Sequence, residues 1–151
     1  MRRVVIPEIL DSESCPAEEA AASLEDIGRI NRWFGGVSTS QALIERVAER
    51  TGEKRFSLLE VASGFGDVPK IVARNLALLG IELEITFLDR MRSHLLEGNR
   101  SLVADGLALP FRDAAFDLVS CNLFAHHLEP EELARFVREA VRVSPARGAD
   151  Q

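Results

Sequence analysis

The sequence predicts an α/β fold in which a parallel sheet carries helices on both faces and is preceded by a small helical cap. Two observations favour this architecture. Short apolar runs of strand length alternate with stretches of helical period between residues 55 and 143. Most of these runs end on an acid or a glycine turn, as strands do when they feed helices in such sheets. The chain of 151 residues, 46% of them apolar, is long enough for one domain with its own core.

Two segments are expected ahead of the sheet. Residues 1–22 are rich in acids, serine, proline and alanine, which predicts a flexible arm. Residues 23–54 are expected to form the helical cap as two short helices. The first begins near Ser23 and carries Ile27, Ile30 and Phe34 at helical spacing, with Trp33 beside them; the second begins at Ser38 and ends at Gly52.

The first half of the predicted sheet spans residues 56–88. The apolar run Phe56–Ala62 predicts a buried strand. Asp67 can cap the next helix, which Gly80 ends, and Pro69 falls in its first turn, where a missing N–H costs little. A second strand is expected over Leu83–Leu88.

The second half continues the same rhythm. A short helix is expected through Met91, Leu95 and Leu96, then a brief strand over Leu102–Ala104 and a fourth strand over Phe116–Cys121. Glu129 and Pro130 open a last helix, and residues 144–151 are expected to be a disordered tail. Residues 55–143 are therefore predicted to form the main domain.

Composition and charge exclude several classes of protein. The net charge of −6 argues against a general nucleic-acid-binding protein, which needs a basic face. Pro7 and Glu8 interrupt the apolar start too early for a signal peptide, and no apolar run reaches membrane-spanning length. Cys15 and Cys121 lie far apart, so we expect reduced thiols and a cytoplasmic protein, with a disulfide between them left open.

Polar side chains recur where the predicted strands end. Glu60, Asp89, Asp105 and Asn122 each occupy such a position, and a glycine turn at residues 62–66 leads into a helix N-terminus. Ligands of parallel sheets bind at this edge, and a helix N-terminus favours an anionic group. Each residue alone is equally explained by turn or capping chemistry, but the ordered set predicts a ligand site.

The sequence does not match either of two common nucleotide-binding motifs. Counting from Gly64, the third glycine of a dinucleotide fingerprint would fall on Pro69, which argues against nicotinamide or flavin binding. A phosphate-binding loop needs lysine followed by serine or threonine, whereas Lys70 is followed by Ile71.

Three stretches carry a family resemblance: LLEVASGFGD, ITFLD and VADGLALPFRDAAFDLVSCNLFAHHL. Together they resemble the class I S-adenosylmethionine-dependent methyltransferases, and the small-molecule branch with the ubiquinone and menaquinone methyltransferases is most similar. The resemblance covers about residues 56–143 and implies a Rossmann-like domain that binds S-adenosylmethionine. It implies methyl transfer to a small, apolar organic acceptor.

The resemblance also implies the role of each site residue. Glu60 would face the methionine end of the cofactor, and Asp89 would accept both ribose hydroxyls. Asn122 would lie beside the transferred methyl group. The remaining implied contacts are the glycine-rich loop at Ala62, Gly64 and Gly66, and the adenine contact at Asp105 and Gly106. Ala62 stands where the family has a glycine, so a positive φ there would cost stability and crowd the cofactor.

Catalysis requires little of the protein beyond positioning, because the leaving group of a sulfonium is neutral. An oxygen acceptor of high pKa also needs a base, and His126 and His127 are the nearest histidine candidates. The alternative is structural: one packs under the sheet end and the other caps the following helix. His94 is expected on the helix after the second strand, away from the site. No metal site is expected, since adjacent histidines face different ways.

The end of the chain departs from the family. VRVSPARGADQ has no apolar run for a fifth strand, whereas the family builds a seven-stranded sheet. We therefore expect a C-terminally truncated methyltransferase, or a non-catalytic remnant that acts as a cofactor-binding or interaction module. Its fourth strand would be an open edge through which copies could associate.

Overall fold

The computed structural model describes residues 35–95, 97–122 and 124–145. The elements of this part of the chain are α2 (Gly36–Thr51), β1 (Arg55–Val61), α3 (Asp67–Leu78), β2 (Glu82–Asp89), the 3₁₀ turn η2 (Arg92–His94), β3 (Ser101–Val103), β4 (Leu118–Cys121), the 3₁₀ turn η3 (Ala125–His127) and α4 (Pro130–Val143). No helix among these residues is long and apolar enough to cross a membrane. The predicted arm, the helix at Ser23, the residues Trp33 and Cys15, and the tail beyond residue 145 lie outside the described residues.

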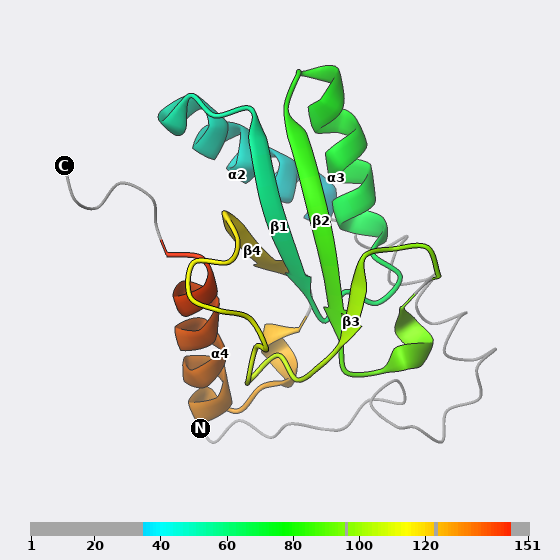
Figure 1. Ribbon diagram of the computed structural model, residues 1–151, viewed down its shortest axis with the longest axis vertical. Helices are drawn as coiled ribbons and strands as arrows, with labels where there is room; N and C mark the ends of the chain where they lie inside the picture. The colour runs from blue at the N-terminus through cyan, green and yellow to red at the C-terminus, as the bar shows by residue number, and fades with distance from the viewer. Residues whose placement is uncertain (1–34, 96, 123, 146–151) are drawn as a thin grey trace.

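The four strands form one parallel sheet in the order β3-β2-β1-β4 (Figure 1). β1 pairs with β2 along its whole length, from Arg55 opposite Glu82 to Val61 opposite Leu88. Its other edge pairs with β4, from Leu58 opposite Leu118 to Val61 opposite Cys121. The carboxyl ends of β1, β2 and β4 therefore meet at one edge of the sheet, as the sequence predicts for the site.

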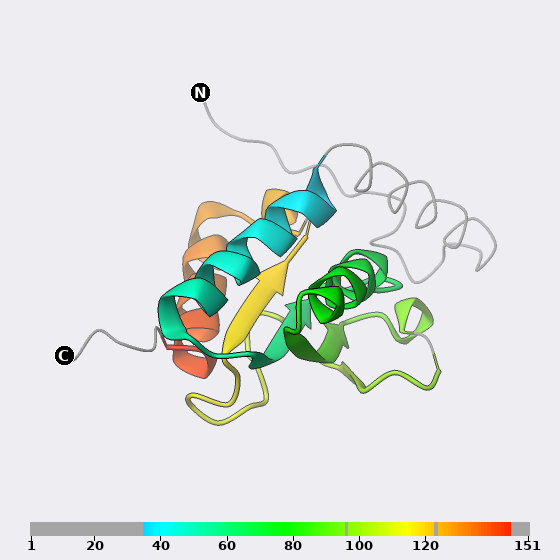
Figure 2. The ribbon, with the colours of Figure 1, turned by 90° about the horizontal axis from the view of Figure 1, so that it is seen from above.

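Helices cover both faces of the sheet. On one face, α2 and α3 pack over Phe56 of β1 in a core that includes Ala48, Val72 and Leu76. On the other face, α4 and the segment before β4 pack over Leu59 and Val61. Figure 2 shows β4 lying between α2 and α4. The predicted fold class is confirmed, and the helix ahead of the sheet is part of the main core.

Several predicted boundaries change in the structure. The helix expected from Ser38 begins at Gly36, because Gly35 in a left-handed conformation (φ 91°) starts it, and Ser38 Oγ instead donates back to Gly35 O at 3.1 Å. The helix expected through Met91 and Leu95 is only the turn η2. Three apolar positions at helical spacing predicted a helix, but the connection between β2 and β3 is too short to form a stable one.

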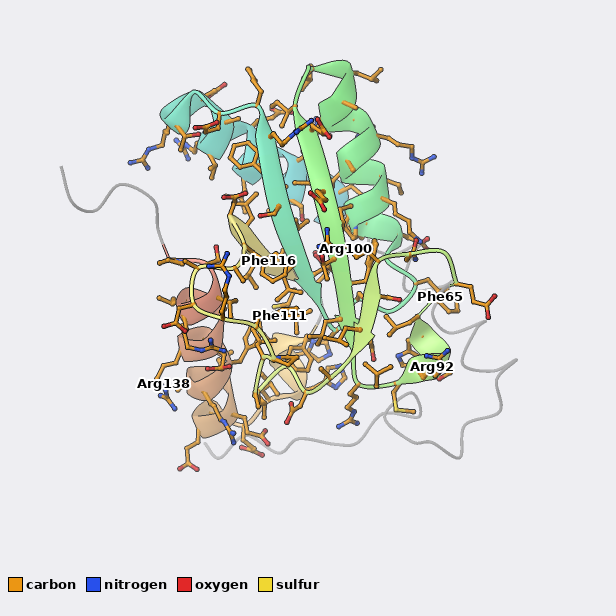
Figure 3. All side chains as sticks on the ribbon, in the orientation of Figure 1. Phe65, Arg92, Arg100, Phe111, Phe116 and Arg138 are labelled. Carbon is orange, nitrogen blue, oxygen red and sulfur yellow. The ribbon has the colours of Figure 1, made fainter. Side chains whose placement is uncertain are left out.

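The segment before β4 is fastened to α4 by Arg142. Its guanidinium donates to the carbonyl oxygens of Phe111 (2.7 Å) and Leu109 (2.9 Å), and to both oxygens of Glu139. Glu139 Oε2 also accepts the Leu109 N–H at 2.8 Å. These contacts of Arg142 form a clamp. Within the same segment, Phe111 and Phe116 meet edge to face with ring centroids 4.9 Å apart, and Figure 3 shows both beside β4.

Asp117, which precedes β4, joins that strand to β1. Its Oδ2 accepts both the N–H and the hydroxyl of Ser57 at 2.8 Å, and its own N–H donates to Ser57. The stretch LPFRDAAFD, which carries much of the family resemblance, is therefore held by specific polar contacts at both of its ends.

Candidate functional site at the carboxyl ends of the strands

The loop between β1 and α3 bends sharply over the edge of the sheet. Ala62, Gly64 and Gly66 all have positive φ, of 53°, 50° and 68°. A Cβ on Gly66 would lie only 2.3 Å from the ring of Phe87, so this glycine is required both for its φ and for close approach to β2. Ala62 takes the strained conformation without a glycine, which makes it the costly departure from the family pattern.

Asp89 ends β2 and is built into this loop. Its Oδ2 accepts the N–H of Gly64 at 3.0 Å, and its Oδ1 accepts the N–H of Met91 at 2.9 Å. Burial would raise the pKa of this carboxyl, but hydrogen bonds from His94, Met91 and Gly64 hold the pKa below its usual range. Asp89 is therefore an anion only 6% exposed, fixed at the mouth of the glycine loop.

The structure contradicts the predicted placement of His94. It was expected on a helix away from the site, but the turn η2 brings its Nδ1 to 3.3 Å from Asp89 Oδ1. The sequence offered one signal, a polar ring five positions after a strand-ending acid, and the helical interpretation of this segment concealed it. Figure 3 shows Arg92, from the same turn, at the same end of the molecule as Phe65 of the glycine loop.

Glu60 and Asn122 come together from neighbouring strands. Asn122 Nδ2 donates to Glu60 Oε1 at 2.8 Å, and the Ser120 hydroxyl donates to Glu60 Oε2. Burial raises the pKa of the Glu60 carboxyl, which is 1% exposed, although the bonds from Ser120 and Asn122 oppose that effect. Ser120 belongs to this cluster and was not anticipated, because the register of β4 against β1 places it there.

A pocket of about 140 Å³ opens on the α2 and α3 face beside this cluster. Glu60, Ser120 and Asn122 line its polar part, and aliphatic side chains line the rest. These include Leu43, Ile44 and Val47 of α2, Val68 and Val72 of α3, and Leu58 and Leu118 of the sheet. The arrangement is an apolar recess with a few polar groups at one end, which is typical of small-molecule sites.

Asp105 and Gly106 form a turn after β3. Asp105 is exposed, and its Oδ1 accepts the N–H of Leu107 at 2.8 Å, which is the turn chemistry that the sequence left as an alternative. Gly106 is buried, and a Cβ there would lie 2.9 Å from Val61 Cγ1. Its lack of a side chain therefore lets the turn pack against the end of β1.

His126 and His127 lie in η3, with ring centroids 4.0 Å apart. Neither histidine lines the pocket beside Glu60. Neither caps α4, because Glu129 and Glu132 form its capping box. Within residues 35–145 as described, no three histidine, cysteine, aspartate or glutamate side chains gather as metal ligands. Cys121 is a free thiol whose pKa burial raises to about 11.

The residues at this edge leave hydrogen-bonding positions open to a polar ligand. Asp89 accepts three contacts at its two oxygens, and a carboxylate offers about four acceptor positions, so one remains on Oδ2. A ribose hydroxyl can use that position. The glycine loop leaves backbone open to a ligand, and the Glu60 carboxyl lies one strand away.

Comparisons with known proteins agree with this geometry. A family model described as a methyltransferase domain matches residues 59–149, which is more than half of the chain. No curated protein gives a significant match.

Solved structures share the fold. They include a protein from Methanococcus maripaludis assigned as an S-adenosylmethionine-dependent methyltransferase (15% identity, TM-score 0.57, 91% of this chain and 63% of that one). The sugar N-methyltransferase KedS8 from Streptoalloteichus has 24% identity and a TM-score of 0.58, over 80% of this chain and 49% of that one. Phosphoethanolamine N-methyltransferase 1 from Haemonchus contortus, solved with S-adenosylhomocysteine, has 15% identity and a TM-score of 0.50, over 88% of this chain and 32% of that one.

The chain spans between about a third and two thirds of the length of these proteins. Its sheet, its glycine loop and the family match over residues 59–149 agree on one assignment. The chain belongs to the methyltransferase-domain family, whose cofactor is S-adenosylmethionine.

Proposed function

We propose that this protein transfers a methyl group from S-adenosylmethionine to a small, apolar organic acceptor. The observation that carries the proposal is Asp89, a buried anion held by the N–H of Gly64 at the mouth of the glycine loop. The stretch ADGLALPFRDAAFDLV, which resembles the small-molecule branch with the ubiquinone and menaquinone methyltransferases, supports such an acceptor. The reaction is assigned to the cytoplasm.

The cofactor-binding roles follow the order of the strand ends. Asp89 binds the ribose through Oδ2, and the loop of Ala62, Gly64 and Gly66 supports the rest of the nucleoside. Asp105 and Gly106 contact the adenine. Glu60 and Asn122 face the methionine end from β1 and β4, where they already share a hydrogen bond.

The apolar acceptor is assigned to the pocket beside Glu60. Val47 and Leu43 of α2 and Leu118 of β4 supply an aliphatic wall, and Asn122 lies at its polar end. S-adenosylmethionine supplies a methyl group on a positively charged sulfur, which leaves as a neutral thioether. The protein's own task is to hold the acceptor atom in line with that methyl group and to keep water out. For an oxygen acceptor, the base is assigned to His126 or His127, which lie outside this pocket and would take the proton through an intervening water.

Calorimetric titration with S-adenosylhomocysteine tests cofactor binding. We expect saturable heat for the natural chain and a loss of affinity of about tenfold or more for Asp89→Asn, because a charged acceptor is lost. Glu49→Gln, on the exposed side of α2, is the matched control and keeps full affinity. No heat and no thermal shift at millimolar ligand would overturn the proposal.

Turnover tests the acceptor assignment separately. Val47→Phe fills the pocket from α2, so we expect it to abolish methyl transfer to small phenols and quinols while the dissociation constant for S-adenosylhomocysteine stays within about twofold. Equal loss of cofactor affinity in this variant would place the pocket in the cofactor site instead.

A second candidate function, self-association, is favoured by the open edge of the sheet at β4. β4 pairs only with β1 among the described strands, and its sequence LVSC has no charge or proline to block further pairing. Figure 2 shows α2 and α4 on either side of β4, and each helix carries an exposed aliphatic side chain, Leu43 at 60% and Val141 at 59%. We propose that the chain acts as a non-catalytic interaction module that self-associates through β4 of a second copy, because identical edges are self-complementary about a two-fold axis.

Light scattering after size exclusion tests the association. We expect a dimer that the double variant Leu43→Lys and Val141→Lys converts to a monomer. Leu78→Lys is the control, since Leu78 is 88% exposed on α3, which does not flank β4. A natural chain that stays monomeric across a wide range of concentration would contradict self-association.

A further inference from the structure

His94 is buried beside the acid that we assign to the ribose. It is the buried residue of η2, whose Arg92 and Ser93 are exposed. Its Nδ1 lies 3.3 Å from Asp89 Oδ1, and the two side chains are 11% and 8% exposed. A polar ring withdrawn from water in a surface turn needs a polar partner, and Asp89 provides one.

The two oxygens of Asp89 have different surroundings. Oδ1 accepts the N–H of Met91 at 2.9 Å and faces His94, whereas Oδ2 accepts only the N–H of Gly64 at 3.0 Å. The terminal torsion of an aspartate is broad, so the groups that hold one oxygen decide where the other points. The free acceptor position is therefore on Oδ2, and the contacts on Oδ1 set its direction.

We propose that His94 is a positioning residue for a ligand with a vicinal diol, the ribose of the cofactor. Its Nδ1–H holds Oδ1, so that Oδ2 of Asp89 faces a ribose hydroxyl. The histidine itself does not touch the ligand. This inference rests on the proposed function and adds a residue that acts through Asp89.

The test compares S-adenosylhomocysteine with its 2′-deoxy and 3′-deoxy analogues by calorimetry. For the natural chain, removal of the hydroxyl that Asp89 binds is expected to weaken binding about tenfold. His94→Phe keeps a ring but has no donor, so it should weaken S-adenosylhomocysteine about tenfold and leave that deoxy analogue within about twofold. His94→Asn places an amide nitrogen near the position of Nδ1 and should restore discrimination between the ligands to within about threefold of the natural chain.

Controls separate positioning from stability. Arg92→Ala alters an exposed residue of the same turn and should leave every dissociation constant unchanged. His94→Leu is a second donor-free variant, and thermal unfolding of each variant reports its fold. Equal weakening of all ligands, or failure of both donor-free variants to fold, would make His94 a stability residue and overturn the proposal.

Different results would overturn the proposed function and the role of His94. If the natural chain binds none of the ligands, the proposed function fails. If it binds S-adenosylhomocysteine and discriminates against a deoxy analogue, but His94→Phe does the same, only the role of His94 fails.

Discussion

Glu60, near the end of β1, is deeply buried and accepts hydrogen bonds from two side chains. The Ser120 hydroxyl and the Asn122 amide both donate to it, yet burial still raises the pKa of its carboxyl. The folded state therefore binds this proton more tightly than the unfolded chain does. By linkage, stability is lost as pH rises from the unfolded pKa, about 4.3, through the raised folded pKa.

Glu60→Gln removes this titration while its amide oxygen still accepts from Asn122. We expect the variant to exceed the natural chain in free energy of unfolding at pH 8, and the difference to shrink as the pH falls toward the unfolded pKa. Urea unfolding at pH 8 and near the unfolded pKa measures it. Glu53→Gln, an exposed acid before β1, should show no such trend, and a variant equally destabilised at both pH values would contradict the argument.

Ala62 carries backbone strain at the start of the glycine loop, with φ at 53°. Ala62→Gly relieves that strain at the cost of a more flexible unfolded chain, so we expect a net gain of about 0.5–1 kcal/mol in free energy of unfolding. Affinity for S-adenosylhomocysteine should rise or stay equal. Ala114→Gly, with φ at 52°, should also stabilise, whereas Ala73→Gly inside α3 should destabilise.

At the scale of elements, the segment between β3 and β4 has no helix or strand of its own and depends on α4. Arg142 donates hydrogen bonds to the carbonyl oxygens of Leu109 and Phe111 and to the carboxylate of Glu139. The pKa of Glu139 is lowered chiefly by its hydrogen bond with Arg142. The clamp thus fixes the segment that follows the Asp105–Gly106 turn.

Arg142→Lys keeps the charge but loses the planar fork, so one ammonium cannot reach all of these acceptors. We expect a lower midpoint of thermal unfolding and faster hydrogen exchange at the Leu109 amide, which donates to Glu139. Arg138→Lys is the matched control, because Figure 3 shows Arg138 on the outer side of α4. Unchanged exchange at Leu109 would show that the clamp is dispensable.

At the scale of the whole molecule, β1 pairs with a strand on each side and contributes to both cores. Phe56 faces the helices α2 and α3, and Leu59 faces α4. Because one strand contributes alternate side chains to the two cores, loss of packing on one face should weaken both.

Leu76→Ala tests this coupling on the α3 side, where Leu76 has no exposed surface. We expect a loss of about 2–5 kcal/mol in free energy of unfolding, with amide protection reduced in α4 as well as in α3. Leu78→Ala, two residues further along α3 and 88% exposed, should change stability by less than about 0.5 kcal/mol. Reduced protection confined to α2 and α3 would show that the two cores unfold separately.

The sequence alone determined the succession of the strands and main helices along the chain, the acids at the strand ends and the glycine loop. These features follow from local periodicity and turn chemistry, which short stretches such as LLEVASGFGD carry in themselves. Pro69 lies in the first turn of α3, as predicted, although the N-cap is Gly66 in a left-handed conformation and not Asp67.

The tertiary structure decided what those residues meet. Ser120 reaches Glu60 because β4 lies beside β1, and the two are 60 positions apart in the chain. His94 reaches Asp89 because η2 is a turn and not a helix, and Ala62 takes a positive φ because the loop must close over the edge of the sheet. Such contacts depend on strand order, register and loop closure, which are set by the packing of distant segments and leave no periodic signal in the sequence.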